Sequence, residues 1–271
     1  MRVFITGGTG LVGTPLVQRL RERRDEVVIL TRRPAFALEQ FGNASTILEG
    51  DPTQADQWMA AVSDCDAVIN LAGENIFHQR WNEQFKALLR DSRLKATSNV
   101  VQALAHNPHQ LSGAPKVLVN ASAIGFYGPH GDEEIMEESP PGDDFLARLC
   151  VDWEQAARTA EASGVRVVTM RTGLVLDRAG GALPQLLTPF KMFVGGPFGS
   201  GSQWVSWVHH DDLTGLYLLA LDNAEAHGPI NGTSPNPVVN REFTHALGRT
   251  LHRPSFIRTP HFALSLMLGE V

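Results

Sequence analysis

The chain has 271 residues and a formal net charge of −6, with 43% hydrophobic and 19% charged residues. This length corresponds to one large domain or two small ones, and the balance of residue types argues against long disordered segments. The acidic balance disfavours nucleic acid as the main partner. Two cysteines are too few for a disulfide framework or a zinc cluster.

The longest apolar stretch, at about 213–221, falls far short of the ~20 residues that a membrane span requires. The first residues form a strand-like run and show no signal-peptide pattern. We therefore expect a cytoplasmic protein that binds a small molecule and has no metal, nucleic acid or membrane partner. The sequence leaves the oligomeric state open.

Short β-branched runs alternate with segments of helical period, the pattern of a parallel sheet covered by helices on both faces. The expected strands are Arg2–Thr6, Glu26–Leu30, Ser45–Leu48, Ala67–Leu71, Lys116–Ser122 and Arg166–Arg171. The expected helices begin near residue 11 and cover about 54–62, 81–105 and 144–162. After the sixth strand glycine and proline become dense, and a strand at 204–208 and a helix at 211–221 follow. We interpret 1–172 as the sheet domain and 173–271 as a small lobe interleaved with it; the apolar run 262–268 suggests a truncated C-terminus.

A glycine-rich loop follows the first expected strand. Its glycines are Gly7, Gly10 and Gly13, and Thr9, Leu11 and Val12 lie between them. In a dinucleotide fold the first glycine allows a tight turn, the second lets the backbone approach a pyrophosphate, and the third lets the helix pack against the strand. The helix N-terminus then offers free N–H groups to phosphate. A plain strand-to-helix turn is the alternative, but the context favours an α/β fold with a doubly wound parallel Rossmann sheet in the order 3-2-1-4-5-6.

The end of the second strand indicates which dinucleotide is bound. An NAD site places a carboxylate there for the ribose 2′-hydroxyl, but this chain has Thr31 and Arg32 instead. A hydroxyl and a guanidinium suit the 2′-phosphate of NADP. Arg33, which precedes a proline, is equally consistent with a solvated side chain. The expected cofactor is NADP(H).

Further motifs narrow the family. They are Leu71-Ala72-Gly73-Glu74-Asn75-Ile76, Arg80-Trp81-Asn82, Gly195-Gly196-Pro197-x-Gly199-Ser200-Gly201 and Trp207-Val208-His209-His210-Asp211-Asp212-Leu213. With the glycine loop they resemble an extended short-chain dehydrogenase/reductase, and in particular the atypical branch called epimerase family proteins. That branch is related to sugar-nucleotide epimerases, and its substrate is undefined.

The expected cofactor contacts beyond the glycine loop come from three places. Leu71, Ala72 and Gly73 end the fourth strand at the switch point of the sheet, where the adenine half is expected. Arg93 lies at the edge of an apolar helical stripe and needs a partner; a cofactor phosphate and an internal salt bridge are the two alternatives. The resemblance favours the cofactor for Arg93 and alone places Val175 beside the nicotinamide.

The family resemblance also shows which catalytic residues are missing. Carbonyl-reducing members use a serine after the fifth strand and a Tyr-x-x-x-Lys pair on the next helix. Ser122 matches the serine, but the tyrosine position falls at Leu146 or Phe145 and the lysine position at Cys150 or Leu149. Tyr127 is a substitute proton donor or a structural tyrosine, and Cys150 is expected to be a buried, inert thiol rather than a redox-active one.

The segment 195–207 is the expected edge of the substrate site. Related sugar-nucleotide enzymes carry an arginine there for the substrate diphosphate, whereas this chain has tryptophans and serine. His209, just before a helix, is expected to cap or pack. The first hypothesis is an NADP(H)-dependent oxidoreductase or epimerase with a non-standard proton donor and an unknown substrate. The second is a non-catalytic protein that senses NADPH; a true sugar-nucleotide epimerase is a weaker third.

Overall fold

The computed structural model describes residues 1–105 and 117–258. Its core is a seven-stranded parallel sheet of order β10-β6-β5-β4-β1-β2-β3. The strands are β1 (Arg2–Thr6), β2 (Glu26–Thr31), β3 (Thr46–Glu49), β4 (Ala67–Asn70), β5 (Val117–Ala123), β6 (Arg166–Thr172) and β10 (Gly228–Gly232). The expected order 3-2-1-4-5-6 is confirmed, and β10 adds a seventh strand at the β6 edge. The expected strand start at Lys116 and the apolar run 262–268 lie outside the described residues.

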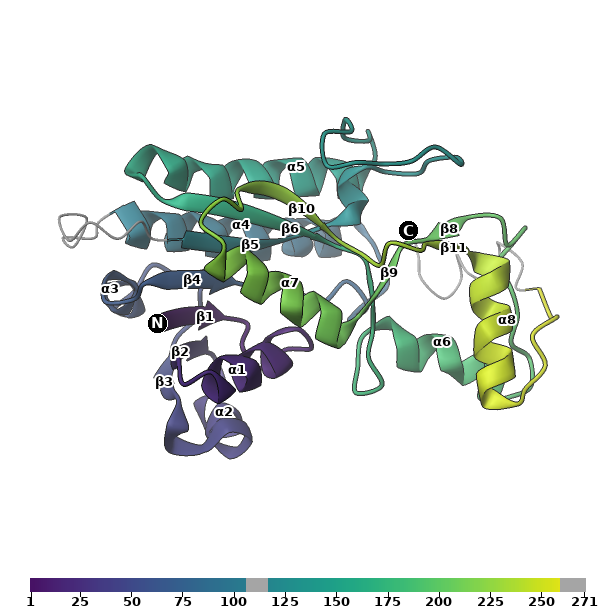
Figure 1. Ribbon diagram of the computed structural model, residues 1–271, viewed down its shortest axis with the longest axis horizontal. Helices are drawn as coiled ribbons and strands as arrows, with labels where there is room; N and C mark the ends of the chain where they lie inside the picture. Colours follow the sequence, from purple (N-terminus) through teal and green to yellow (C-terminus); the bar gives the residue numbers. More distant parts are fainter. Residues whose placement is uncertain (106–116, 259–271) are drawn as a thin grey trace.

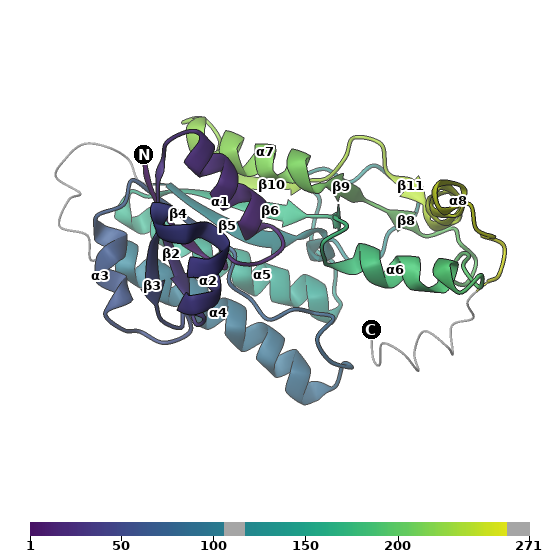
Figure 2. The same ribbon diagram turned by 90° about the horizontal axis from the view of Figure 1, so that it is seen from below.

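Helices cover both faces of this sheet (Figures 1 and 2). On one face α1 (Gly13–Glu22), α2 (Pro34–Phe41) and α7 (His210–Asp222) pack against alternate strand residues such as Val3 and Ile5. On the other face α3 (Trp58–Ser63), α4 (Glu83–Ala105) and α5 (Phe145–Arg158) pack against the intervening residues, such as Phe4. Burial on both faces explains why the strands read as continuous apolar runs rather than as alternating ones.

Short elements complete the framework. Within the described residues, 3-10 helix lies at Gly42–Ala44, Ile124–Phe126 and Thr159–Ser163, and the last segment continues α5 over much of the expected helix 144–162. Of the helices that the structure describes, none is long and apolar enough to cross a membrane.

The lobe lies beyond the carboxyl ends of the strands (Figure 1). It contains α6 (Ala182–Lys191), α8 (Asn240–Leu251) and two small sheets: β7 (Leu174–Leu176) with β9 (Trp207–His209), and β8 (Trp204–Val205) with β11 (Val238–Val239). The single strand expected at 204–208 is therefore wrong: Ser206 interrupts it, and the two halves pair with different partners. Because α7 and β10 return to the main sheet, the chain crosses between sheet and lobe more than once.

Candidate functional site

The glycine loop joins β1 to α1 in a geometry that requires glycine at two positions. Gly7 has φ +69°, and a Cβ there would lie 2.8 Å from the carbonyl oxygen of Leu71. A Cβ on Gly13 would lie 2.6 Å from the Cα of Gly8 and closer still to the oxygen of Gly7. Gly10 N–H donates to the oxygen of Gly7 at 3.0 Å and closes the turn. The first and third glycines thus occupy the tight-turn and close-packing positions of a dinucleotide loop.

The start of α1 is open to an anion. No side chain caps this helix, and no acidic residue lies in its first turn. Its N–H groups and the positive end of its dipole are therefore available to phosphate. Leu11, in the loop, would touch a Cβ placed on Gly181, so the beginning of the lobe lies against this side of the site.

The end of β4 is fixed to the end of β1. Thr6 Oγ1 accepts a hydrogen bond from Ala72 N–H at 3.2 Å and donates to Asn70 Oδ1 at 2.6 Å. Leu71 packs against the same core cluster as Val12 and Val175. The expected cofactor residues 71–73 therefore lie beside the glycine loop.

Of the two arginines that follow β2, Arg32 has a guanidinium without a partner among the described residues. Thr31 is buried, and its Oγ1 accepts from Arg33 N–H at 3.1 Å. The Arg33 guanidinium lies 4.9 Å from the centre of the Phe36 ring. Arg32 is exposed and has neither a hydrogen bond nor an ion pair with the residues that the structure describes. Because Leu30 pairs with Thr6, this end of β2 lies next to the glycine loop.

Arg93 extends from α4 under the loop that follows β4. Its Nη1 donates to Leu89 O and its Nη2 to Glu74 O, both at 3.0 Å, and its Cζ lies 5.1 Å from the centre of the Trp153 ring. Burial lowers the pKa of Arg93 from its usual value. The internal salt bridge is not what we observe: among the described residues Arg93 bonds to carbonyl oxygens. A Cβ on Gly73 would lie 3.2 Å from the guanidinium carbon, so this glycine lets the loop approach the arginine.

A buried ion pair that the sequence did not predict lies at the carboxyl ends of β5 and β6. Glu154 of α5 accepts from Arg171 Nε and Nη2, each at 2.9 Å, and both side chains are less than a tenth exposed. Ser122 Oγ donates to Glu154 Oε1 at 2.6 Å. Although burial lowers it, hydrogen bonds with Glu154 and Tyr127 hold the pKa of Arg171 above its usual value. Ser122 therefore lies against a carboxylate.

Tyr127 joins the same group. Its hydroxyl donates to Asn231 Oδ1 at 2.6 Å and accepts from Arg171 Nη1 at 2.9 Å. Burial raises the pKa of Tyr127 despite the neighbouring guanidinium. The phenol therefore stays protonated near neutral pH, and it can act as a proton donor only by leaving Asn231. Its catalytic role stays a prediction.

The structure shows where the candidate positions of the missing pair lie on α5. Leu146 lies against Gly125, and Cys150 lies beside Ser122 and Ala123. Leu149, Phe145 and also Leu146 pack against the apolar cluster of Trp81 and Phe85. The side chains that face Ser122 from α5 are therefore Cys150 and Glu154. Burial, followed by the charge of Glu154, raises the pKa of Cys150 to about 11, which makes it a poor nucleophile.

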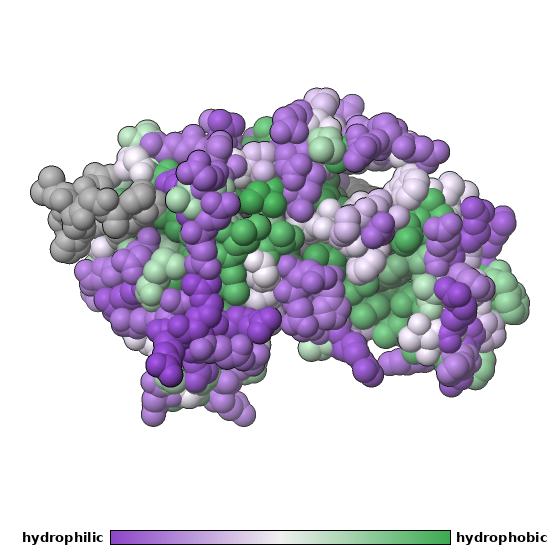
Figure 3. All heavy atoms as spheres, in the orientation of Figure 1, coloured by the Kyte–Doolittle hydropathy of each residue, from purple (hydrophilic) through white to green (hydrophobic). Residues whose placement is uncertain are grey.

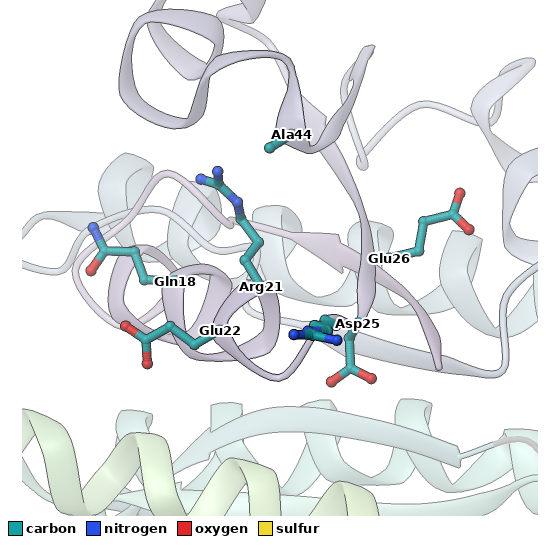
Figure 4. A pocket seen from close by; sticks show the side chains of 7 residues that line it. Gln18, Arg21, Glu22, Asp25, Glu26 and Ala44 are labelled. Atoms are coloured by element: carbon teal, nitrogen blue, oxygen red, sulfur yellow. The ribbon is translucent and has the colours of Figure 1, made fainter.

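Two hollows and one histidine group lie around this framework. A cavity of about 620 Å³, here called the lobe cavity, lies between the loop 127–135 and the lobe. Another, of about 590 Å³, lies between the end of α1 and the start of β2, at the opposite edge of the sheet, where Arg21 extends towards Ala44 (Figure 4). At the start of α7 Asp211 N–H donates to His209 Nδ1 at 3.2 Å, the capping role expected for this histidine.

Comparison with known proteins settles the family. The model of the NAD dependent epimerase/dehydratase family matches residues 3–231. The chain belongs to this family. Within the family it is 43% identical over 270 residues to the Arabidopsis thaliana "Epimerase family protein SDR39U1 homolog, chloroplastic", covering 100% of this chain and 76% of that protein. The resemblance to epimerase family proteins drawn from the motifs is thereby confirmed.

Two solved structures of this family are similar. Human epimerase family protein SDR39U1, crystallised with NADPH, superposes with a TM-score of 0.85 at 36% identity, covering 100% of this chain and 86% of that chain. A structure described as a nucleoside-diphosphate sugar epimerase from Corynebacterium glutamicum gives a TM-score of 0.76 at 37% identity, covering 98% of this chain but only 54% of that chain. Both superpositions therefore cover the sheet and the lobe of this chain.

Proposed function

We propose that the chain binds NADP(H) at the carboxyl ends of β1, β2 and β4 and uses it as an oxidoreductase or epimerase on a small molecule. The observation that carries the cofactor choice is Arg32, directly after β2, where the sequence has no carboxylate. Its guanidinium is exposed and has no partner among residues 1–105 and 117–258. The human relative that was crystallised with NADPH supports the same choice.

Different residues of the chain would bind different parts of NADP(H). Gly7, Gly10 and Gly13 let the backbone approach a pyrophosphate at the uncapped start of α1. Thr31 and Arg32 would receive the 2′-phosphate, and residues 71–73 would line the adenine half. Arg93, held under Gly73, supplies a buried positive charge to this edge of the sheet. Val175 remains assigned to the nicotinamide end.

NADP(H) exchanges a hydride at its nicotinamide, so the protein has only to orient the substrate and move a proton. A carboxylate paired with a guanidinium accepts hydrogen bonds, so the Ser122 proton is directed at Glu154. Ser122 Oγ therefore offers lone pairs to the site. It suits a substrate hydroxyl or amine that donates a hydrogen bond better than a bare carbonyl that needs one. Tyr127 is our candidate for the proton donor.

A second function, the binding of NADPH without catalysis, is supported by the missing tyrosine and lysine. The resemblance puts the tyrosine position at Leu146 or Phe145 and the lysine position at Cys150 or Leu149, so neither residue is present in either alignment. The raised pKa of Cys150 keeps its thiol protonated near neutral pH. A protein that binds NADPH as a sensor and turns nothing over needs neither residue. Under both functions, ordinary short-chain dehydrogenase substrates should give no appreciable NADPH oxidation, since general acid–base help is typically worth ~10²–10⁴-fold.

Calorimetry with NADPH and NADH tests the cofactor site. Wild type should prefer NADPH by roughly ten- to hundredfold, as one charge-assisted hydrogen bond of about 1.5–3 kcal/mol implies, and Arg32→Ala should lose most of that preference. Arg33→Ala is the matched control, because it removes the same charge one residue away. Equal affinities of the wild type for the two cofactors would refute the assignment.

A thermal-shift screen of metabolites, with and without saturating NADPH, then separates the two functions. A metabolite that stabilises only the NADPH-bound protein identifies the substrate site. Net oxidation of NADPH in the presence of that metabolite supports an oxidoreductase, and conversion of the metabolite to its epimer without a net change in the cofactor supports an epimerase. Absence of both changes supports the sensor.

A further inference from the structure

The lobe cavity is a second hollow whose lining differs from that of the cofactor site. One wall is the loop 127–135 and the other is formed by Trp204, Ser206 and residues 231–237. In Figure 3 the hydrophilic side chains of the loop between β5 and α5 lie at the upper right, across an opening from the paler surface of the lobe. Its volume of about 620 Å³ lies within the ~300–1,000 Å³ range of small-molecule sites.

Three carboxylates and one histidine are the titratable acidic and imidazole side chains of this cavity, so its charge is negative. Asp132, Glu133 and Glu134 line it, and among the described residues that line it there is no lysine or arginine. His130 Nδ1 lies 2.8 Å from Glu133 Oε1, and the hydrogen bond raises the pKa of His130 and lowers that of Glu133. A protonated His130 neutralises one of the three carboxylates, so the cavity stays negative.

The Arg171 guanidinium, which contacts a residue of the cavity lining, does not make the charge of the cavity positive. Arg171 donates a hydrogen bond to the hydroxyl of Tyr127, which lines the cavity. The charge of Arg171 is neutralised by Glu154, whose two carboxylate oxygens accept hydrogen bonds from it. A phosphate or carboxylate ligand would therefore meet unpaired negative charge without a basic partner. Like charges brought together in this way disfavour binding.

An aromatic wall stands directly beside the carboxylates. Trp204 Nε1 donates to Asp132 Oδ1 at 2.8 Å, which holds the indole next to the acidic loop across 72 residues of sequence. Ile124 and Pro237 add apolar surface to the same cavity. An aromatic ring next to a carboxylate is the combination that holds an ammonium group, through the ring face and the charge together.

We propose that the lobe cavity binds a small organic cation, with its ammonium group against Asp132 and Glu134 and its apolar part against Trp204. Glu134 has neither a hydrogen bond nor an ion pair within the described ranges, so its carboxylate is available to a ligand. Tyr127 and Trp204 line the cavity and also belong to the proposed substrate site, so as a statement about the substrate this inference rests on the proposed function. Binding of the cation itself does not require NADPH.

The indole N–H resonance of Trp204 reports on this site. The chain has five tryptophans, and the resonance that disappears in Trp204→Phe is that of Trp204. Titration of the full chain with benzyltrimethylammonium should shift this resonance, whereas benzenesulfonate, an anion of similar size, should leave it in place. A shift of equal size with the anion, or no shift with up to tens of millimolar of the cation, would overturn the proposal.

Two variants connect the shift to the carboxylates. Asp132→Asn/Glu134→Gln keeps an acceptor for the indole and removes two charges, so about tenfold more cation should be needed. Glu138→Gln is the control, because it removes a charge from the same exposed loop outside the cavity lining. A double variant that titrates like wild type would contradict the proposal; if it does not fold, Glu134→Gln alone repeats the test with a smaller expected change. NADPH affinity, measured on the same samples, tests the cofactor site separately.

Discussion

Ser122 Oγ lies 2.6 Å from Glu154 Oε1, and Arg171 donates to both oxygens of the same carboxylate. The three residues come from the ends of β5 and β6 and from the middle of α5. A side chain that family members use to hold a substrate oxygen is thus tied to a buried ion pair. Ser122 and Arg171 therefore both depend on one buried carboxylate.

Neutralising Glu154 should strongly destabilise the fold. Glu154→Gln leaves the Arg171 guanidinium buried without a counter-charge, a change that typically costs about 3–5 kcal/mol. Urea denaturation followed by circular dichroism measures the loss. The control is Asp152→Asn on the same helix, whose exposed pair with Arg90 is worth about 1 kcal/mol or less. Equal losses in the two variants would mean that the Arg171–Glu154 pair contributes no more than a surface pair.

Two glycine-to-alanine changes should have opposite effects. Gly13→Ala places a Cβ against Gly7 and Gly8, so it should lower both stability and NADPH affinity. Gly215→Ala lies in α7, where a new Cβ meets nothing within 4 Å, and it should stabilise by up to ~1 kcal/mol because alanine favours helix. Thermal unfolding and NADPH calorimetry on both proteins check this. Unchanged NADPH affinity in Gly13→Ala would contradict a role of the loop in binding.

Removal of the Tyr127 hydroxyl separates its two possible roles. Tyr127→Phe should leave NADPH affinity unchanged and lower turnover of any substrate that the thermal-shift screen identifies. It also leaves Asn231 Oδ1 without its donor, so unfolding should cost about 1–3 kcal/mol less than in wild type. Full turnover in a destabilised Tyr127→Phe protein would show that the tyrosine is structural only.

Cys150 should react slowly with alkylating reagents in the native protein. With a pKa of about 11, roughly a thousandth of the thiol is ionised at pH 8. The rate of iodoacetamide labelling, followed by mass spectrometry, should rise steeply as the pH approaches 11. In urea the thiol should react at the rate of an ordinary cysteine, and Cys150→Ser identifies any signal from Cys65.

The same shift has a consequence for stability. The folded state holds the Cys150 proton more tightly than the unfolded state, whose thiol titrates near its ordinary value of 9.0. This contribution is therefore fully present below about pH 9 and is lost as the pH rises towards 11. Cys150→Ser should remove that part of the pH dependence.

The sequence alone was sufficient for six of the seven strands of the main sheet and for the glycine loop. Val3, Phe4 and Ile5 form a strand that is buried on both faces, and the glycines follow it directly, so local residue chemistry specifies the turn. The same holds for Arg32, since its position depends only on where β2 ends. Each of these features depends on neighbours in the chain.

Only the tertiary structure decided what surrounds Ser122. No pattern in the sequence connects Glu154 with Arg171, and they meet because α5 and β6 both pack against β5. Likewise β10, with the sequence Gly-Pro-Ile-Asn-Gly, has little strand propensity, and it becomes a strand by pairing with β6. Once water is excluded, a buried charge without a counter-charge is strongly destabilising, so Glu154 and Arg171 form a specific contact. The two residues are far apart in the chain, and no local sequence pattern predicts this contact.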